Sequence, residues 1–465
     1  MNLLKLFTIS SPSSKKVAAE CEGKLYRRLR METFLAGTLG YALYYVCRLS
    51  MGVMKQPLID AELLTATQLG VIGACLYWTY AVGKLVNGFL ADRANIKRFM
   101  TVGLVLSASA NFIMGILGIS ALSGAITNAA LFILFALCWG INGWAQSMGA
   151  PPAIVGLSRW FPLRIRGTFY GFFSASHNIG EGLSFLAVGL LVATFGWKWG
   201  FFGAALAGAV GVVLILLMMH DTPESEGLSS IEVLAGEKSL LEKPSSNISP
   251  EEATKRKRAI QKMAVCNPGI WVLAGASAFL YISRYAINEW GIIFLQESKG
   301  YELAEAAAVV SINPIFGIIG TVVSGWLSDT LFKGDRKYTA FAVGILEVVA
   351  LALFLFGGAD RWINSLAMVL FGIAIGVLIS FLPGLMAIDL VPREASGAAI
   401  GITGIASYVA AGIQMVVTGV LLDSSSGDTT IGTHDYTYVC WFWLGAAVLS
   451  CLLPILNWRR KSMVL

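Results

Sequence analysis

The stretch Gly88-Phe-Leu-Ala-Asp92-Arg93, followed by Lys97 and Arg98, decides how this chain is organised. It recurs as Gly325-Trp-Leu-Ser-Asp329, followed by Arg336 and Lys337. Two other landmarks recur at nearly the same separation: Tyr45-x-x-Arg48 with Tyr281-x-x-Arg284, and the series Pro162, Gly167, Gly171 with Pro392, Gly397, Gly401. Three landmarks that agree within loop-length variation predict two copies of one structural unit.

The composition places both copies in a membrane. The 465 residues are 56% hydrophobic and only 13% charged, with a mean hydropathy of +0.70. Soluble domains are about 45–50% apolar and about 25% charged, so a soluble globular protein is excluded, and so is a disordered chain. The seven cysteines are odd in number and form no C-x-x-C pair, which predicts neither a zinc site nor a disulfide framework.

Twelve segments are long and apolar enough to cross a bilayer as helices, which takes about 20 residues each. They lack the alternating ten-residue pattern of a membrane β-barrel. The predicted fold class is an all-α integral membrane protein with twelve transmembrane helices in two six-helix pseudo-symmetric bundles, as in the major facilitator fold. The predicted spans are 32–54, 68–91, 99–120, 127–149, 167–194, 197–219, 269–296, 306–329, 338–357, 362–390, 397–422 and 437–457.

The longest polar stretch, residues 220–268, divides six spans from six. Its basic run, 255–258, is expected to mark the cytoplasmic side of the membrane and not to bind nucleic acid. The first thirty residues lack the apolar core of a signal peptide. The predicted parts are a cytoplasmic tail (1–30), an N-terminal bundle (31–219), a cytoplasmic linker (220–268), a C-terminal bundle (269–458) and a second cytoplasmic tail (459–465).

The basic residues predict the orientation. Of the 34 lysines and arginines, 27 lie in the tails, the linker and the connections on their side of the membrane. The alternate connections hold four, at Lys55, Lys198, Lys299 and Arg361. The positive-inside rule then puts both termini in the cytoplasm, in a multi-pass protein of the inner (plasma) membrane.

Three basic residues remain inside predicted spans: Arg48, Lys84 and Arg284. Each costs about 2.5–3.5 kcal/mol at the bilayer centre, so such residues are kept where they line a cavity or meet an anion. The two arginines are repeat equivalents, one in each half. Their guanidinium groups match a phosphate bidentately, which predicts a two-sided clamp for an anionic ligand. The alternative is internal pairing, of Arg284 with Glu289 or Glu347 and of Lys84 with Glu181.

Aromatic and polar residues share helix faces with these charges. Tyr41, Tyr44 and Tyr45 precede Arg48 at helical spacing, and Tyr77 and Tyr80 precede Lys84 in the same way. Tyr281, Tyr285 and Asn288 accompany Arg284. Ser174, His177, Asn178 and Glu181 form one face of the fifth span. Each stripe is also compatible with plain helix packing, and a histidine inside a span is often only a helix–helix hydrogen bonder.

On these residues the chain resembles the organophosphate:phosphate antiporter family of the major facilitator superfamily, and its hexose-phosphate branch most. The matching stretches are Tyr45-Val-Cys-Arg48, Gly83-Lys84 through Asp92-Arg93, Gln146-Ser-Met-Gly149-Ala-Pro151-Pro152, His177-Asn178-Ile-Gly180, Tyr281-Ile-Ser-Arg284 and Gly404-Ile-Ala-Ser-Tyr408. The chain departs from the family where Ala150 stands in place of a frequent Trp and Glu181 in place of Gly.

The resemblance implies roles for named residues. Arg48, Arg284, His177 and Lys84 are implied to bind the phosphoryl group, and Glu289 is implied to be a charge partner. Glu181 is expected to be a second charge partner because it shares a helix face with His177. Residues that line the cavity or read the organic part are expected at Tyr41, Tyr45, Gln146, Asn178, Tyr281, Asn288 and Tyr408. The repeated loop (Gly88, Asp92, Arg93, Asp329) is expected to be structural, through a charge network that latches neighbouring helices.

The predicted function is exchange of a hexose phosphate, with glucose 6-phosphate favoured, for inorganic phosphate by alternating access. No cofactor, no metal and no catalytic residue is predicted, and the chain is expected to work as a monomer. Open alternatives are a sensor that signals sugar phosphate to a kinase partner, an antiporter for glycerol phosphate or another organophosphate, and a proton symporter with a Glu181–His177 relay. A membrane enzyme is disfavoured because no span carries a Ser/His/Asp set or paired metal ligands.

Overall fold

The computed structural model describes residues 8–235, 262–331, 336–391, 395–424 and 434–458, and within them every long element is a helix. The side chains of 325–331 are not described, so the role predicted for Asp329 lies outside the described part, as do the basic run 255–258 and the tail 459–465. The long helices are α1 (Ala19–Asp60), α2 (Ala66–Ala91), α3 (Ile96–Leu122), α4 (Asn128–Gln146), α5 (Ala150–Trp160), α6 (Leu163–Leu183), α8 (Trp197–Met218), α11 (Pro268–Lys299), α12 (Leu303–Leu331), α13 (Arg336–Phe356), α14 (Arg361–Ser380), α16 (Ser396–Ser424) and α17 (Thr437–Leu452).

Two spans contain a single π-helical turn. Ser184–Val188 joins α6 to α7 (Gly189–Phe195), and Phe381–Leu385 joins α14 to α15 (Met386–Asp389). The second turn contains Pro383, which has no N–H to continue an α-helical ladder. The helical backbone runs through both π-helical turns without a break, so both spans are continuous, as predicted from hydropathy.

Eleven helical stretches of the described residues are long and apolar enough to span a membrane, and they coincide with eleven of the twelve predicted spans. The remaining prediction, 32–54, falls within α1, a 42-residue helix whose tyrosines and charged residues lower its hydropathy. Many of these polar residues are buried against other helices and do not face lipid. The twelve-helix fold class is confirmed.

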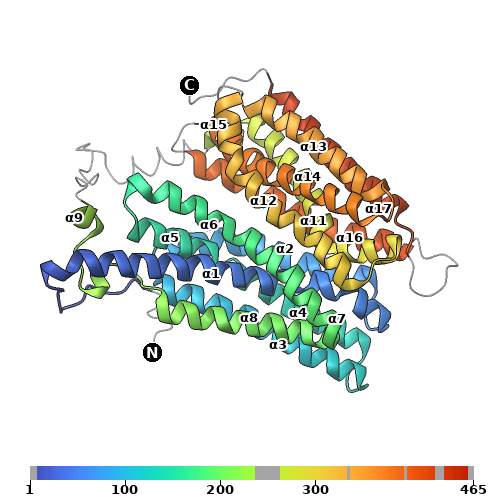
Figure 1. Cartoon of the computed structure of the whole chain (residues 1–465), viewed down its shortest axis with the longest axis horizontal. Coiled ribbons are helices and arrows are strands. Elements are labelled where there is room, and N and C mark those ends of the chain that lie inside the picture. The colour runs from blue at the N-terminus through green and yellow to red at the C-terminus, as the bar shows by residue number, and fades with distance from the viewer. Residues whose placement is uncertain (1–7, 236–261, 332–335, 392–394, 425–433, 459–465) are drawn as a thin grey trace.

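The two halves repeat one packing pattern. In the first half α1 packs on α6 and α8, and α2 packs on α4; in the second half α11 packs on α16 and α17, and α12 packs on α14. The halves meet through α2 against α16 and through α6 and α7 against α12. In Figure 1 they form two inclined groups of helices that approach at the right of the view and diverge at the left.

Glycine contacts show which end of the molecule is closed. A Cβ at Gly70 of α2 would lie 2.4 Å from the Met415 carbonyl oxygen of α16, and one at Gly189 would lie 2.6 Å from the Ala307 side chain of α12. At the other end, Gly88 and Gly401 of the same α2–α16 pair have nothing within 4 Å. The halves are therefore in backbone contact at one end and apart at the other.

Asp423 reinforces the closed end. Its carboxylate accepts hydrogen bonds from the backbone N–H groups of Ala66 (3.2 Å) and Thr67 (2.8 Å), which begin α2. Since the first N–H groups of a helix lack partners within the helix and carry partial positive charge, a carboxylate from α16 caps α2 across the boundary between the halves.

The open end carries the repeated loop and the start of the linker. Arg159 binds the Asp221 carboxylate at 2.6 Å and donates to the carbonyl oxygens of Asp92 and Ala94. Within the described residues, neither Asp92 nor Arg93 forms an ion pair. Among the described residues the charged side chains that hold this loop are Arg159 and Asp221, and a structural role for Asp92 and Arg93 stays a prediction.

Candidate functional site

Arg48 lies at the meeting point of the two halves inside a group of tyrosines. Its side chain is 1% exposed, and its guanidinium carbon lies 4.3 Å from the centre of the Tyr80 ring and 5.5 Å from that of Tyr408. One guanidinium nitrogen donates to the Tyr285 hydroxyl at 3.2 Å. The rings come from both halves, and their negative faces partly stabilise a buried cation.

No carboxylate among the described residues pairs with Arg48, and its Nε is buried without a hydrogen-bond partner. A buried charge with an unused donor is costly unless an anion completes it. The geometry is that of a cation held ready for an anionic ligand.

Arg284, the repeat equivalent, is paired across the boundary. Its Nη2 donates to the Glu181 carboxylate of α6 at 2.9 Å, and the other oxygen of that carboxylate accepts from the Asn288 amide. Asn288 accepts in turn from Asn313 at 3.0 Å. The partners predicted under the pairing alternative, Glu289 and Glu347, are therefore wrong for Arg284.

Glu289 pairs instead with Lys55, the residue directly after the end predicted for the first span. Lys55 Nζ lies 3.0 Å from Oε2 of Glu289 and 2.6 Å from its carbonyl oxygen, and the Tyr77 hydroxyl donates to Oε1 at 2.5 Å. The placing of Lys55 in an external loop was wrong: its side chain is fully buried in α1. Gly52 permits this contact, because a Cβ there would lie 3.1 Å from the Asn288 carbonyl oxygen.

Helical spacing could have located Lys55. It follows Arg48 and Gly52 at i+7 and i+3, so it continues the face that carries Tyr41 and Tyr45. The predicted span ends too early because hydropathy assigns a lysine near a span boundary to the connection, whereas α1 continues to Asp60.

Lys84 faces a cavity of about 310 Å³ between α2 and α16 at the open end. Its Nζ lies 5.2 Å from the centre of the Tyr408 ring, and within the described residues it forms no ion pair. The predicted alternative partner, Glu181, is bound to Arg284 instead. The cavity volume reaches the lower end of the range for small-ligand sites, roughly 300–1,000 Å³. Its lining residues are Ala81, Lys84, Leu85, Gly88, Phe89, Asp92, Gly397, Ile400, Gly401, Gly404, Ile405 and Tyr408.

Tyrosine rings from both halves lie close to one another next to this cavity and around Arg48. Tyr408 lies 4.6 Å from Tyr80 and 5.3 Å from Tyr281, measured between ring centres. On the other side Tyr45 lies 5.4 Å from Tyr41 and 5.8 Å from the half-buried His177. The predicted phosphate-binding and cavity-lining residues on α1, α6, α11 and α16 are thus close neighbours in space.

Two predicted cavity residues have other surroundings. Gln146 is 1% exposed and donates to the Tyr44 carbonyl oxygen at 2.9 Å and to Ser107 at 2.7 Å, inside the first half. The prediction that it lines the cavity is therefore wrong. Asn178 faces α12, where its Oδ1 would lie 3.3 Å from a Cβ at Gly317.

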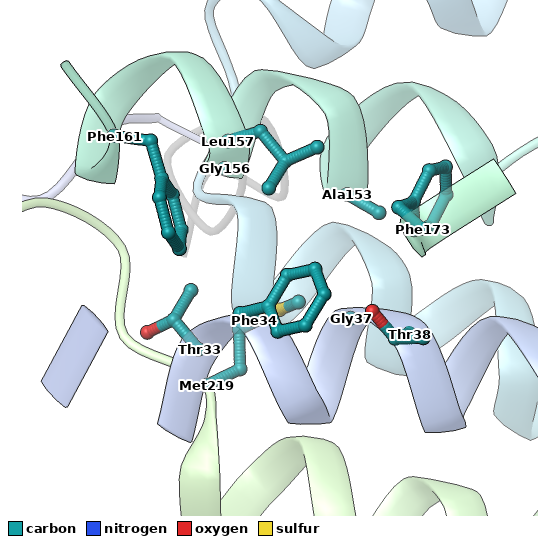
Figure 2. A pocket seen from close by; sticks show the side chains of 10 residues that line it. All are labelled: Thr33, Phe34, Gly37, Thr38, Ala153, Gly156, Leu157, Phe161, Phe173 and Met219. Atoms are coloured by element: carbon teal, nitrogen blue, oxygen red, sulfur yellow. The ribbon is translucent and has the colours of Figure 1, made fainter. Parts of the chain in front are cut away.

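A small crevice near the linker end of α1 is no rival site. Figure 2 shows its apolar lining between α1 and α5, including Phe34, Leu157 and Phe161. Its volume of about 10 Å³ has room for one water molecule, so it cannot hold a metabolite.

The sequence of residues 37–415 matches the model of the Major Facilitator Superfamily. The chain belongs to that superfamily. It is 33% identical over 403 residues to a protein named probable hexose phosphate transport protein from Chlamydia trachomatis, covering 83% of this chain and 84% of that one. It is 32% identical to the glycerol-3-phosphate transporter of Bacillus subtilis, with 83% and 84% covered. It is 30% identical to the membrane sensor protein UhpC of Salmonella typhimurium, with 84% of each covered.

These relatives place the chain in the organophosphate:phosphate antiporter branch of the superfamily, as its sequence motifs indicated. A crystal structure of a bacterial homolog of the human lysosomal transporter Spinster has the same fold. It superposes with a TM-score of 0.70 at 17% identity, over 92% of this chain and 97% of that one. The chain is a membrane transport protein by family and fold, not an enzyme.

Proposed function

We propose that this protein exchanges a hexose phosphate, with glucose 6-phosphate as the first candidate, for inorganic phosphate across the inner membrane. The observation that carries the proposal is Arg48, a buried guanidinium without a carboxylate partner among the described residues and with an unused Nε donor. A phosphoryl group supplies several strong acceptor oxygens and up to two negative charges, which suit such a donor.

The proposal assigns a role to each neighbouring cation. Arg48 and Arg284 hold the phosphoryl group from the two halves, while Lys84 and His177 add donors from α2 and α6. The sugar lies toward the cavity that Lys84 and Tyr408 line, where aromatic rings cover the apolar face of a pyranose and polar side chains meet its hydroxyls. The names of the Chlamydia and Bacillus relatives support a phosphate ester as the substrate class.

Alternating access follows from the two-ended geometry. The halves touch at the end with Gly70 and Asp423 and are apart at the end with Gly88 and Gly401. With both termini in the cytoplasm, as the basic residues predict, the open end faces inward. The halves would rock about the bound phosphate, breaking the Lys55–Glu289 and Asp423–α2 contacts to open the other end.

The proposal is tested with purified protein in liposomes loaded with phosphate. Labelled glucose 6-phosphate outside should enter, and internal phosphate should leave with it. Competition by unlabelled glucose 6-phosphate, glycerol 3-phosphate and 3-phosphoglycerate then ranks the esters. Absence of any exchange with all three esters would overturn the proposal.

A sensor is the second candidate, because a sensor protein is among the relatives. A sensor needs the same binding site but not the rocking motion. Counterflow separates the two: a sensor binds the ester in detergent but does not accumulate label against an internal unlabelled pool.

A further inference from the structure

Glu181 is the one acidic side chain, among the described residues, that binds either of the two repeat-related arginines. It is 1% exposed, and both its oxygens are used, one by Arg284 and one by Asn288. It comes from the first half, whereas both of its partners lie on α11 of the second. The contact is therefore an ion pair between the halves at the level of the candidate site.

The Glu181–Arg284 ion pair uses the guanidinium group that, under the proposed function, also binds the phosphate. A phosphoryl group bridging Arg48 and Arg284 must share or displace the Glu181 carboxylate, since both anions take the same guanidinium. In the empty carrier the carboxylate already supplies Arg284 with the charge that phosphate would bring. Among the described residues Arg48 has no ion-pair partner, and its direct contacts include the Tyr285 hydroxyl and nearby tyrosine rings such as Tyr80.

The location of Glu181 lets the pair survive a conformational change. Its neighbour Gly180 packs on α1, where a Cβ would lie 2.1 Å from the Ala42 carbonyl oxygen, and Gly182 approaches Pro314 of α12 across the boundary. Farther along α6 toward the open end, Gly171 has nothing within 4 Å. Glu181 thus lies where the closed and open parts of the boundary meet, and points near such a junction move least when the halves rock.

We propose that Glu181 is a built-in counter-ion that takes the place of phosphate on Arg284, so that the empty carrier can reorient and the protein performs net transport as well as exchange. Without Glu181, two guanidinium groups would face each other in a medium of low dielectric, and their repulsion would oppose closure of an empty site. With it, Arg284 is neutralised, and of the two arginines Arg48 alone lacks an ion-pair partner among the described residues. The inference rests on the proposed function and goes beyond it.

The test uses inorganic phosphate alone, so it does not depend on which ester is the substrate. Labelled phosphate enters liposomes loaded with either unlabelled phosphate or chloride, with potassium and valinomycin holding the voltage at zero. The ratio of the two initial rates measures net transport relative to exchange. In the wild type, entry into chloride-loaded liposomes should be readily measurable.

The decisive variant is Glu181→Gln, which keeps the shape and the hydrogen-bonding capacity but removes the charge. Its entry into chloride-loaded liposomes should fall about tenfold or more relative to its own exchange rate. Glu347→Gln is the matched control: Glu347 is equally buried but binds only the hydroxyls of Ser283 and Ser450. It should keep the wild-type ratio.

An unchanged ratio in Glu181→Gln would overturn the inference, and so would a wild type that takes up phosphate only by exchange. If Glu181→Gln transports nothing, phosphate binding to the detergent-solubilised variant decides: a tighter Kd than the wild type supports an internal competitor, and an equal or weaker one rejects it. A wild type that exchanges neither phosphate nor any ester would refute the proposed function itself.

Discussion

The Arg48 guanidinium, from the first half of the chain, donates to the Tyr285 hydroxyl of the second half at 3.2 Å. Tyr285 directly follows Arg284 in the sequence, so this bond ties the two repeat-related arginines into one arrangement. Tyr285 in turn lies 4.5 Å from Tyr77, between ring centres, and the Tyr77 hydroxyl reaches Glu289. The site and the closed end are therefore connected by a short chain of contacts.

Replacing either arginine with lysine should abolish most transport. Lysine keeps the charge but offers no planar fork for two phosphate oxygens. Loss of one charge-assisted hydrogen bond, about 1.5–3 kcal/mol, should weaken phosphate binding by roughly 10- to 100-fold in Arg48→Lys. Titration calorimetry on detergent-solubilised protein measures this, and an unchanged Kd would mean that Arg48 has a structural role only.

Breaking the Lys55–Glu289 pair on one side should destabilise the protein strongly. Glu289→Ala leaves a fully buried ammonium without its carboxylate, a change that typically costs about 3–5 kcal/mol. The double variant Lys55→Met with Glu289→Leu should recover much of the loss, because no unpaired charge remains. Thermal unfolding in detergent compares the two, and equal melting temperatures would argue against a paired buried charge.

A larger side chain at Gly70 should destabilise the conformation in which α2 and α16 are in contact at this end. A valine side chain there would meet the Met415 carbonyl oxygen, which is backbone and cannot move aside. We expect Gly70→Val to open that end and to expose Ala307→Cys, which is 1% exposed at the same end, to a thiol reagent in a cysteine-free background. Gly401→Val, which meets open space, should leave that labelling low.

His434 should contribute stability only at low pH. Its ring lies 2.8 Å from Glu297, and the hydrogen bond to that carboxylate raises the pKa of His434 above its usual value near 6.5. The contribution is complete below pH 6.5 and is lost as pH rises through the raised pKa. His434→Gln should therefore lower the melting temperature at pH 5.5, by an amount equivalent to about 1–2 kcal/mol. It should change the melting temperature little at pH 9; a pH-independent difference would contradict this.

Hydropathy predicted the helices well because lipid imposes one simple requirement, an apolar stretch of fixed length. It failed at the end of α1, where Lys55 is neutralised by Glu289 from the other half. Helical spacing places Lys55 on the face of Arg48, but its pairing with Glu289 joins residues far apart in the chain and no local pattern predicts that.

Several predicted site residues, such as Tyr45, Arg48 and His177, lie close together in the structure, but their pairings were not predicted. The periodicity that put Tyr45 and Arg48 on one face is a property of a single helix. The choice among Glu181, Glu289 and Glu347 as the partner of Arg284 depends on how the halves dock, and spacing along one helix carries no information about that. Gln146 failed for a related reason: an amide in a span suits an internal hydrogen-bond network as well as a ligand.

The two sides of the contact between Asp423 and the start of α2 depend differently on the amino-acid sequence. One partner is a side chain, while the other is the main chain of Ala66 and Thr67, which every non-proline residue supplies equally. Most substitutions at the start of α2 would leave these two hydrogen bonds in place, whereas a substitution that removes the carboxylate at position 423 would remove both.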